Sequence, residues 1–228
     1  MAQLNSAVAL VPAAGRGERL GYGMPKALVP VRGVPLLLHA VRGLLDAGRV
    51  RHVVVAAPAD ELETVSALVS GLPVDVVPGG DDRTASVGCA LRHALAVVPD
   101  ARIALVHDAA RAFTPHDVVD RVVDAVAAGA KAVVPVLPVA DTVKRVDAEG
   151  VVLDTPDRSA LRVVQTPQGF DVETLVRAHA SAVSATDDAG LVELLGIPVH
   201  TVAGHPSAMK VTTPHDLAVA EKVLVEGL

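Results

Sequence analysis

The sequence contains little cysteine, few aromatic residues and no excess of positive charge. Its 228 residues include one cysteine, no tryptophan, one tyrosine and two phenylalanines, and the formal net charge is −6 at pH 7. The lone Cys89 cannot form an internal disulfide, which is typical of proteins from a reducing compartment such as the cytoplasm. Nucleic-acid binding usually needs basic surfaces and aromatic stacking platforms. The sequence therefore predicts a cytoplasmic protein that does not bind nucleic acid.

Long hydrophobic runs are also absent. Although 51% of the residues are hydrophobic, no run approaches the ~18 residues that a membrane-spanning helix requires. The apolar stretch near the N-terminus has no Lys or Arg before it, so we expect neither a signal peptide nor a membrane partner. The length is typical of a single domain, which we expect to span residues 1–228.

Short apolar strands alternate with amphipathic helices along the chain. Strands are expected at 7–13, 51–58, 74–80, 102–111, 131–139 and near 198–203. Helices are expected at 35–48, 60–71, 83–98, 114–129, 171–181, 187–195 and after Thr213, with Gly48 as a C-cap and Asp60, Thr114 and Thr213 as N-caps. This alternation indicates an α/β fold: a Rossmann-like three-layer sandwich with a mostly parallel sheet covered on both faces.

Residues 140–162 interrupt this alternation. Two short strand-like runs flank a turn at 148–150, which predicts a β-hairpin. We expect this segment to project from the α/β domain as a β-arm.

Polar, glycine-bearing segments follow three of the predicted strands. They are residues 13–26, 79–83 and 107–111. In open α/β sheets, ligands bind beyond the carboxyl ends of the strands, so these segments together predict a ligand site.

The first of these loops combines glycine with positive charge. Its Gly15-Arg16-Gly17 run lacks the third glycine of the dinucleotide fingerprint, and Lys26 lacks the neighbours that a P-loop requires. One interpretation is an anion site whose backbone N–H groups, with Arg19 and Lys26, contact phosphate. The alternative is a flexible loop with solvated charges.

Asp108 and Lys210 are candidate polar residues of the same site. A carboxylate after a strand and near a phosphate loop is a suitable Mg²⁺ ligand, although Asp108 could instead cap a turn and pair with Arg111. Lys210, expected at the end of a short strand, is either a surface charge or a second cation of the site. No zinc-ligand spacing or nucleophile elbow is present.

Seven motifs, in order and over nearly the whole chain, resemble those of the 2-C-methyl-D-erythritol 4-phosphate cytidylyltransferase family of the nucleotidyltransferase superfamily. The resemblance implies a nucleotide-diphospho-sugar transferase type of fold. It also implies transfer of CMP from CTP to methylerythritol phosphate, with release of pyrophosphate, in non-mevalonate isoprenoid precursor biosynthesis. The motifs are "PAAGRGERLG…MPKAL" (12–28), "GGDDRTASV" (79–87), "VHDAAR" (106–111), "PVADTVKR" (138–145), "DRSALRVVQTPQGF" (157–170), "TDDAGLVE" (186–193) and "MKVTTPHDL" (209–217).

The resemblance also implies roles for individual residues, with Mg²⁺ as cofactor at Asp108. The catalytic cations are Arg19, Lys26 and Lys210. The nucleotide-binding residues are Pro12, Ala13, Ala14, Gly15, Gly80, Asp81, Arg83, Ser86 and Asp108. The residues on the methylerythritol phosphate side are Arg111, Thr142, Arg158, Thr166 and Thr186. The arm at 140–162 is expected to form a homodimer, which would allow Thr142 to act in the neighbouring subunit.

Two other functions remain open at this level. The motifs do not separate methylerythritol phosphate cleanly from another polyol phosphate, such as ribitol 5-phosphate. A non-catalytic nucleotide-binding module is the second alternative. The joint presence of Arg19, Lys26, Asp108 and Lys210 argues against it, because binding alone would not require all four.

Overall fold

The centre of the fold is a mostly parallel sheet of eight strands in the part of the chain that the computed structural model describes, residues 7–15, 23–181 and 185–226. The sheet order runs β10-β7-β11-β6-β1-β4-β5, and β12 pairs with β7. The strands are β1 (Ala7–Pro12), β4 (Val50–Ala57), β5 (Val74–Pro78), β6 (Ile103–Val106), β7 (Ala132–Pro138), β10 (Arg162–Val164), β11 (Gln168–Asp171) and β12 (His200–Ala203). β11 pairs antiparallel with both β6 and β7, so these two strands still run in the same direction.

The pairing register along β7 explains how the chain returns from the arm. β11 pairs with the start of β7 and β10 with its end, both antiparallel, while β12 pairs in parallel with positions 133–136. Because a strand has only two edges, β10 and β11 share one edge of β7 and β12 occupies the other. The short connection between β10 and β11 therefore passes the carboxyl end of β6, where Gln168 pairs with Val106.

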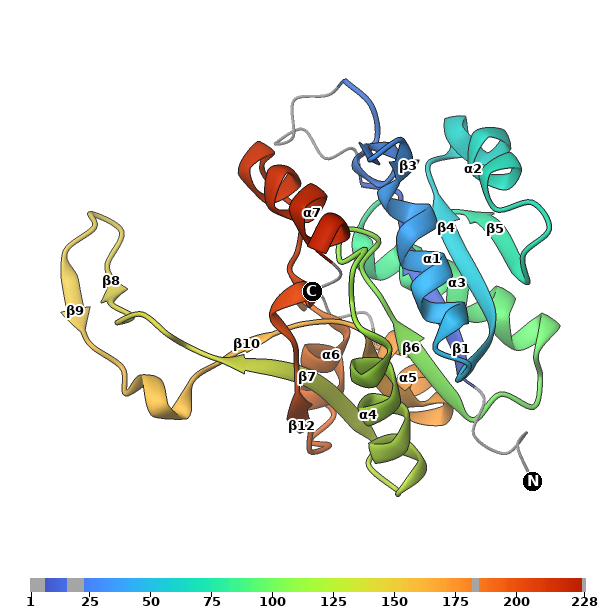
Figure 1. The fold of residues 1–228 in the computed structure, drawn as a ribbon. Coiled ribbons are helices and arrows are strands. Elements are labelled where there is room, and N and C mark those ends of the chain that lie inside the picture. Colours follow the sequence, from blue (N-terminus) through green and yellow to red (C-terminus); the bar gives the residue numbers. More distant parts are fainter. Residues whose placement is uncertain (1–6, 16–22, 182–184, 227–228) are drawn as a thin grey trace.

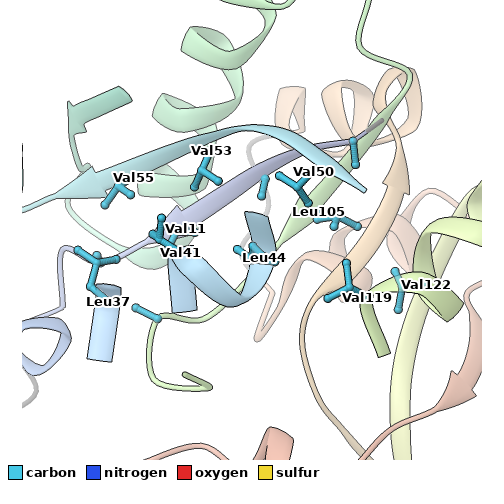
Figure 2. Close-up of a cluster of buried hydrophobic side chains, with 14 of the residues drawn as sticks. Val11, Leu37, Val41, Leu44, Val50, Val53, Val55, Leu105, Val119 and Val122 are labelled. Carbon is cyan, nitrogen blue, oxygen red and sulfur yellow. The ribbon is translucent and has the colours of Figure 1, made fainter. Parts of the chain in front are cut away.

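Helices cover both faces of the sheet (Figure 1). Hydrophobic clusters place α1 (Leu36–Asp46), α2 (Leu62–Leu68) and α4 (His116–Ala127) on one face, and α3 (Arg83–Val97), α5 (Val172–Ala180) and α6 (Asp188–Leu194) on the other. Alternate residues of β1 point to opposite faces: Val11 belongs to the first cluster and Leu10 to the second. Figure 2 shows the first cluster, in which Val41 and Leu44 of α1 lie against valines of β1 and β4. The expected three-layer architecture is confirmed.

A third, smaller cluster fixes the C-terminal helix α7 (Pro214–Glu226) to the domain. Leu217 and Ala220 pack with Val31 and Leu36, near the hairpin of β2 (Pro30–Val31) and β3 (Val34–Pro35). Val29, which separates the 3-10 turn η2 (Lys26–Leu28) from the hairpin, belongs to the same cluster, so the segment that follows Lys26 packs with α7.

Residues 140–162 form an arm that projects from the body of the domain (Figure 1). The arm contains the antiparallel pair β8 (Arg145–Val146) and β9 (Val152–Asp154), followed by the 3-10 turn η4 (Arg158–Ala160). Gly150 adopts φ 87° in the turn between the strands, a conformation that favours glycine. The predicted hairpin is therefore confirmed.

Several local expectations hold and others are wrong. The Thr213 hydroxyl caps α7 as expected, by accepting from the Asp216 N–H at 3.2 Å. The C-cap of α1 is Ala47, and the expected Gly48 is the residue after it, with φ 71°. Asp60, however, lies in a separate 3-10 turn, η3 (Ala59–Glu61), and α2 begins only at Leu62. Thr114 does not cap α4, because the helix begins at His116 and Pro115 occupies the N-cap position without a side-chain cap; the Thr114 hydroxyl donates to the Arg111 carbonyl at 3.0 Å.

Two strand boundaries also differ from the expectation. β6 ends at Val106, because the chain then turns and the Arg111 N–H donates to the Asp108 carbonyl at 2.9 Å. Lys210 does not end a strand: it follows the 3-10 turn η5 (Pro206–Ala208) in a loop. None of the helices in the described ranges is both long and apolar enough to cross a membrane.

The close approach of β11 to α4 predicts different effects for two glycine substitutions. A Cβ at Gly169 would lie 2.4 Å from Cγ1 of Val122, a branched side chain in the core, whereas a Cβ at Gly43 of α1 would meet only the Thr114 carbonyl at 4.0 Å. We expect Gly169→Ala to lower the free energy of unfolding by about 1–3 kcal/mol. Gly43→Ala should leave it unchanged or raise it by up to about 1 kcal/mol. Urea unfolding measures the free energy of unfolding of both variants. Equal stability of the two would contradict the close contact between Gly169 and Val122.

Candidate active site

A cavity of about 320 Å³ opens at the carboxyl ends of β1 and β6, beside the first turn of α3. The three polar segments predicted from the sequence meet there, together with Lys210 from the loop after η5. The lining residues are Pro12, Ala13, Ala14, Gly15, Lys26, Ala27, Gly80, Asp81, Asp82, Arg83, Ser86, Asp108, Ala109, Ala110 and Lys210. The tertiary structure thus assembles one site from loops that are distant in the sequence.

Glycine allows the two loops on one side of the cavity to approach closely. A Cβ at Gly79 would lie 2.5 Å from the Ala14 side chain and 2.9 Å from the Ser86 hydroxyl. At Gly80 a Cβ would lie 2.4 Å from the Ala85 side chain, and the Gly80 N–H donates to the Ser86 hydroxyl at 3.1 Å. Small residues and backbone therefore form this wall, which suits close contact with a flat or extended ligand.

The wall ends at the N-terminus of α3, a 15-residue helix. The Asp82 carboxylate caps the helix by accepting from the Ala85 N–H at 2.7 Å. A helix N-terminus carries a partial positive charge, which favours an anionic ligand. Arg83, the first residue of the helix, adds a full positive charge at the same place.

Asp108 lies between two cations of the cavity. Its Oδ1 accepts from Nε and Nη2 of Arg83, each at 3.3 Å, and its Oδ2 accepts from Nζ of Lys210 at 2.7 Å. The Asp108 side chain is only 12% exposed, whereas that of Lys210 is 43% exposed. Asp108 therefore holds both cations at the edge of the cavity, with the lysine reaching solvent. From the sequence, Asp108 could instead have paired with Arg111. That alternative is wrong, because the Asp108 carboxylate accepts hydrogen bonds from Arg83 and Lys210.

The surrounding charges keep Asp108 ionised. Burial alone would raise its pKa, but the positive charges of Arg83 and Lys210 outweigh this effect and lower the pKa from 3.8 to about 2. Burial and charge also oppose one another at Arg83. Burial lowers the pKa of its guanidinium, but the carboxylates of Asp188 and Asp108 raise that pKa by a larger amount, so the net shift is upward. At neutral pH the site therefore contains a carboxylate held between cations.

Asp188 is a residue of this site that the sequence did not single out. It is fully buried on α6, where its Oδ2 accepts from Nη1 of Arg83 at 2.6 Å and its Oδ1 lies 2.9 Å from Nε2 of His179. Arg83 is thus held between two carboxylates. The motif "TDDAG" contains Asp188, but nothing in the one-dimensional pattern indicates that α6 lies next to α3 at this point.

Thr166 and His107 form a buried, hydrogen-bonded pair next to Asp108. The Thr166 hydroxyl accepts from the Asp108 N–H at 3.1 Å and lies 3.1 Å from Nδ1 of His107, and both side chains are buried. Burial lowers the pKa of His107 to about 4, so its imidazole is neutral at pH 7. His107 is therefore placed to orient the Thr166 hydroxyl. The Thr166–Pro167 peptide bond is cis.

Other predicted site residues lie outside the cavity lining. Arg111 is adjacent to the cavity, but its guanidinium donates to the carbonyls of Ala208 at 2.7 Å and Val164 at 3.1 Å. Thr142 and Arg158 lie exposed on the arm, where Arg158 donates to the Ala140 carbonyl. Thr186 lies exposed just before α6. Arg19 lies outside the described residues, so its place relative to the cavity is not part of this geometry.

The carboxylates present suit a metal that arrives with a phosphate ligand. Asp108 is directed to the cavity, and Asp81 and Asp82 also line it. Within the described ranges, no three His, Cys, Asp or Glu side chains come together as a ready-made metal site. Mg²⁺ typically uses one or two carboxylates and completes its shell with phosphate oxygens and water, which agrees with this arrangement.

The low pKa of Asp108 predicts how its contribution to stability depends on pH. A carboxyl whose pKa is lowered on folding contributes stability above its unfolded pKa and loses that contribution as pH falls through its folded pKa. The shift from 3.8 to about 2 corresponds to about 2 kcal/mol. We expect the difference in unfolding free energy between the native chain and Asp108→Asn to be constant from pH 7 to 5. It should then shrink by about 2 kcal/mol toward pH 2. Denaturant titrations across this range measure it, and a difference independent of pH would show that Asp108 is not stabilised by these cations.

Comparisons with known proteins agree with the site and the fold. The chain matches the model of the IspD family, 2-C-methyl-D-erythritol 4-phosphate cytidylyltransferase, over residues 7–226. It is 66% identical over 222 residues to the 2-C-methyl-D-erythritol 4-phosphate cytidylyltransferase of Saccharopolyspora erythraea, covering 96% of this chain and 99% of that protein. The protein of the same name from Nocardia farcinica is 59% identical over 220 residues, covering 96% of this chain and 94% of the relative.

Solved structures give the same result. The 2-C-methyl-D-erythritol 4-phosphate cytidylyltransferase of Thermus thermophilus superimposes with a TM-score of 0.79 at 38% identity, covering 96% of this chain and 98% of that chain. The 4-diphosphocytidyl-2C-methyl-D-erythritol synthase of Anaerococcus prevotii superimposes with a TM-score of 0.83 at 25% identity, covering 97% and 99%. The motifs, the fold and these matches together show that the chain belongs to the 2-C-methyl-D-erythritol 4-phosphate cytidylyltransferase family.

Proposed function

We propose that this chain transfers CMP from CTP to 2-C-methyl-D-erythritol 4-phosphate and releases pyrophosphate, a step of non-mevalonate isoprenoid precursor biosynthesis. The observation that carries the proposal is the cavity lined by Lys26, Lys210 and Arg83, in which the last two pair with the ionised Asp108. The match to the family over nearly the whole chain supports the choice of substrates.

The chemistry of this reaction requires positive charge more than acid–base catalysis. The phosphate of the acceptor is already a nucleophile, so it needs no strong general base to attack the α-phosphate of CTP. The main barrier is the approach of two anions and the build-up of charge on the departing pyrophosphate, which fixed cations lower. Lys26 and Lys210 supply such cations, the family motif implies Arg19 as a third, and the neutral, buried His107 takes no part in proton transfer.

The small residues of the cavity wall would recognise the nucleoside. Pro12, Ala13, Ala14 and Gly15 offer backbone groups from the end of β1 and the loop after it, and Gly80, Asp81 and Ser86 come from the segment after β5 and the start of α3. Recognition through hydrogen bonds and close backbone contact agrees with the scarcity of aromatic side chains in the chain. Arg83, held in place by Asp108 and Asp188, would face the phosphates.

Mg²⁺ is the cofactor that fits this site, with Asp108 as its protein ligand. When bound with the triphosphate, the ion would neutralise part of the phosphate charge. Because the Lys210 side chain beside Asp108 is 43% exposed, solvent reaches this part of the cavity, and phosphate oxygens and water would complete the shell of the ion. The single cysteine agrees with a cytoplasmic location.

The acceptor would bind next to Asp108, with help from a second subunit. Arg111 and Thr166 lie beside the cavity and Thr186 precedes α6, whereas Thr142 and Arg158 lie on the projecting arm (Figure 1). A homodimer formed through the arm would allow Thr142 and Arg158 to reach the neighbouring subunit's site. Exposed apolar side chains on the arm, among them Val151, Val152 and Leu153, support this role.

Substitution of the cavity lysines tests the catalytic proposal. We expect Lys26→Ala and Lys210→Ala each to lower kcat for pyrophosphate release from CTP and methylerythritol phosphate by about 100-fold or more, since each removes a cation from the reacting phosphates. Lys131→Ala is the matched control, because Lys131 is 56% exposed and precedes β7 at the opposite end of the sheet. Wild-type turnover in either cavity variant would remove that lysine from the mechanism.

The same assay distinguishes the remaining functions when the acceptor is varied. With Mg²⁺ and CTP, methylerythritol phosphate should give the highest kcat/KM in a panel of polyol phosphates. A preference for ribitol 5-phosphate would identify a different cytidylyltransferase. A chain that binds CTP but releases no pyrophosphate with any acceptor would be a nucleotide-binding module.

The role of the arm is tested by the oligomeric state. We expect the native chain to sediment as a dimer at micromolar concentration and Leu153→Asp to sediment as a monomer, because the charge would be buried in the interface. Leu194→Asp on α6 is the matched control, since Leu194 is 60% exposed and Leu153 is 58% exposed. A monomeric native chain, or a dimer that is insensitive to Leu153→Asp, would contradict assembly through the tip of the arm.

A further inference from the structure

A buried glutamine holds the loop that carries Lys210. Gln165 lies in the connection between β10 and β11 and is 3% exposed. Its Oε1 accepts from the His205 N–H at 3.0 Å, and its Nε2 donates to the His205 carbonyl at 2.9 Å. A side-chain amide that binds both backbone groups of one residue reproduces the pairing of a β-sheet, so it fixes the orientation of that residue as well as its position.

The backbone before His205 leaves little room for another arrangement. The Gly204 N–H donates to the Val136 carbonyl at 2.9 Å, which continues the pairing of β12 with β7. A Cβ at Gly204 would lie 2.3 Å from Oε1 of Gln165 and 3.0 Å from the Val136 carbonyl. Glycine at this position is therefore a requirement of the close contact between the loop and Gln165.

Further contacts hold the loop on the side of the cavity. Nε2 of Gln165 lies within 3.4 Å of the Ala208 carbonyl, to which Arg111 also donates at 2.7 Å. The Val211 N–H then donates to the Ala110 carbonyl at 2.8 Å. Lys210 lies between these attachments and is the residue of this loop that lines the cavity, with its Nζ 2.7 Å from Oδ2 of Asp108.

From this geometry we propose that Gln165 is a positioning residue for Lys210: by fixing the backbone from His205 to Ala208, it sets where the Lys210 ammonium lies in the cavity. The inference rests on the proposed catalytic role of Lys210. Its physical basis is that a displacement of about 1 Å in a catalytic group can lower a rate by about 100-fold. A lysine has a long, flexible side chain, so the position of its backbone determines how often the ammonium reaches the reacting phosphates.

A double-mutant cycle with Lys210 tests this proposal. Gln165→Met keeps the approximate volume of the side chain and removes all of its hydrogen bonds. We expect Gln165→Met to lower kcat at least about 10-fold when Lys210 is present. In the Lys210→Ala background, the same substitution should change kcat less than about 2-fold, because no ammonium remains to be displaced.

Gln168→Met is the matched control. Gln168 is 1% exposed and its amide also joins a loop, donating to Asp187 at 2.7 Å and accepting from the Ala189 N–H at 3.1 Å, but this loop leads into α6. Its effect on kcat should be the same in both backgrounds. An equal loss of kcat for Gln165→Met with and without Lys210 would show that Gln165 only stabilises the fold and would overturn the proposal.

The cycle also distinguishes the catalytic role of Lys210 from the positioning role of Gln165. If Lys210→Ala alone retains wild-type kcat, the proposed role of Lys210 fails. If Lys210→Ala is impaired while Gln165→Met is not, only the positioning role fails. Should Gln165→Met not fold, Gly204→Ala disturbs the same contact from the other partner. Gly204→Ala should lower kcat when Lys210 is present and change kcat little in the Lys210→Ala background. An equal loss of kcat in both backgrounds would again refute the proposal.

Discussion

The site depends on the pairing of one carboxylate, that of Asp108, with two cations from distant parts of the chain. Arg83 is 25 residues away and Lys210 is 102 residues away. A nearly buried carboxylate is costly unless opposite charges compensate for its lost hydration. The fold therefore keeps Asp108 ionised at the end of β6 only by bringing the start of α3 and the loop after η5 to the same point. The need to compensate the charge of Asp108 therefore also places Arg83 and Lys210, the cations that an anionic substrate needs, at this point.

The short segment 165–168, which follows β10 and ends at the first residue of β11, supports each member of this group. Gln165 binds the loop that carries Lys210, and Thr166 accepts from the Asp108 backbone. Gln168 binds the start of α6, on which Asp188 holds Arg83. These four residues, "QTPQ", follow the return of the chain from the arm. Because β10 and β11 pair antiparallel to their neighbours, the segment enters the sheet at the carboxyl end of β6, where the reacting groups of the proposed reaction would lie.

Much of the fold could be predicted from the sequence because it depends on periodicity. Both faces of β1 and β4 are buried, so these strands are continuous apolar runs, and the helices between them show one apolar stripe. Helix starts were less predictable. Thr114 resembles an N-cap in sequence, but the chain continues its preceding turn, in which the Thr114 hydroxyl donates to the Arg111 carbonyl, and α4 begins only at His116. Such choices depend on neighbours in space, which a local pattern does not contain.

By itself, the sequence predicted the α/β architecture, the projecting hairpin and a ligand site formed by the polar loops, while Lys210 was assigned to that site only through the resemblance to a family. Apolar periodicity, glycine at strand ends and family motifs are all local signals, and the chain carries them in order. Only the tertiary structure decided which charges meet. It pairs Asp108 with Arg83 and Lys210 rather than with Arg111, places the buried Asp188 behind Arg83, and uses Gln165 to hold the Lys210 loop. The physical reason is that burial of a polar group requires a partner, and the packing of distant elements decides which partner is within reach.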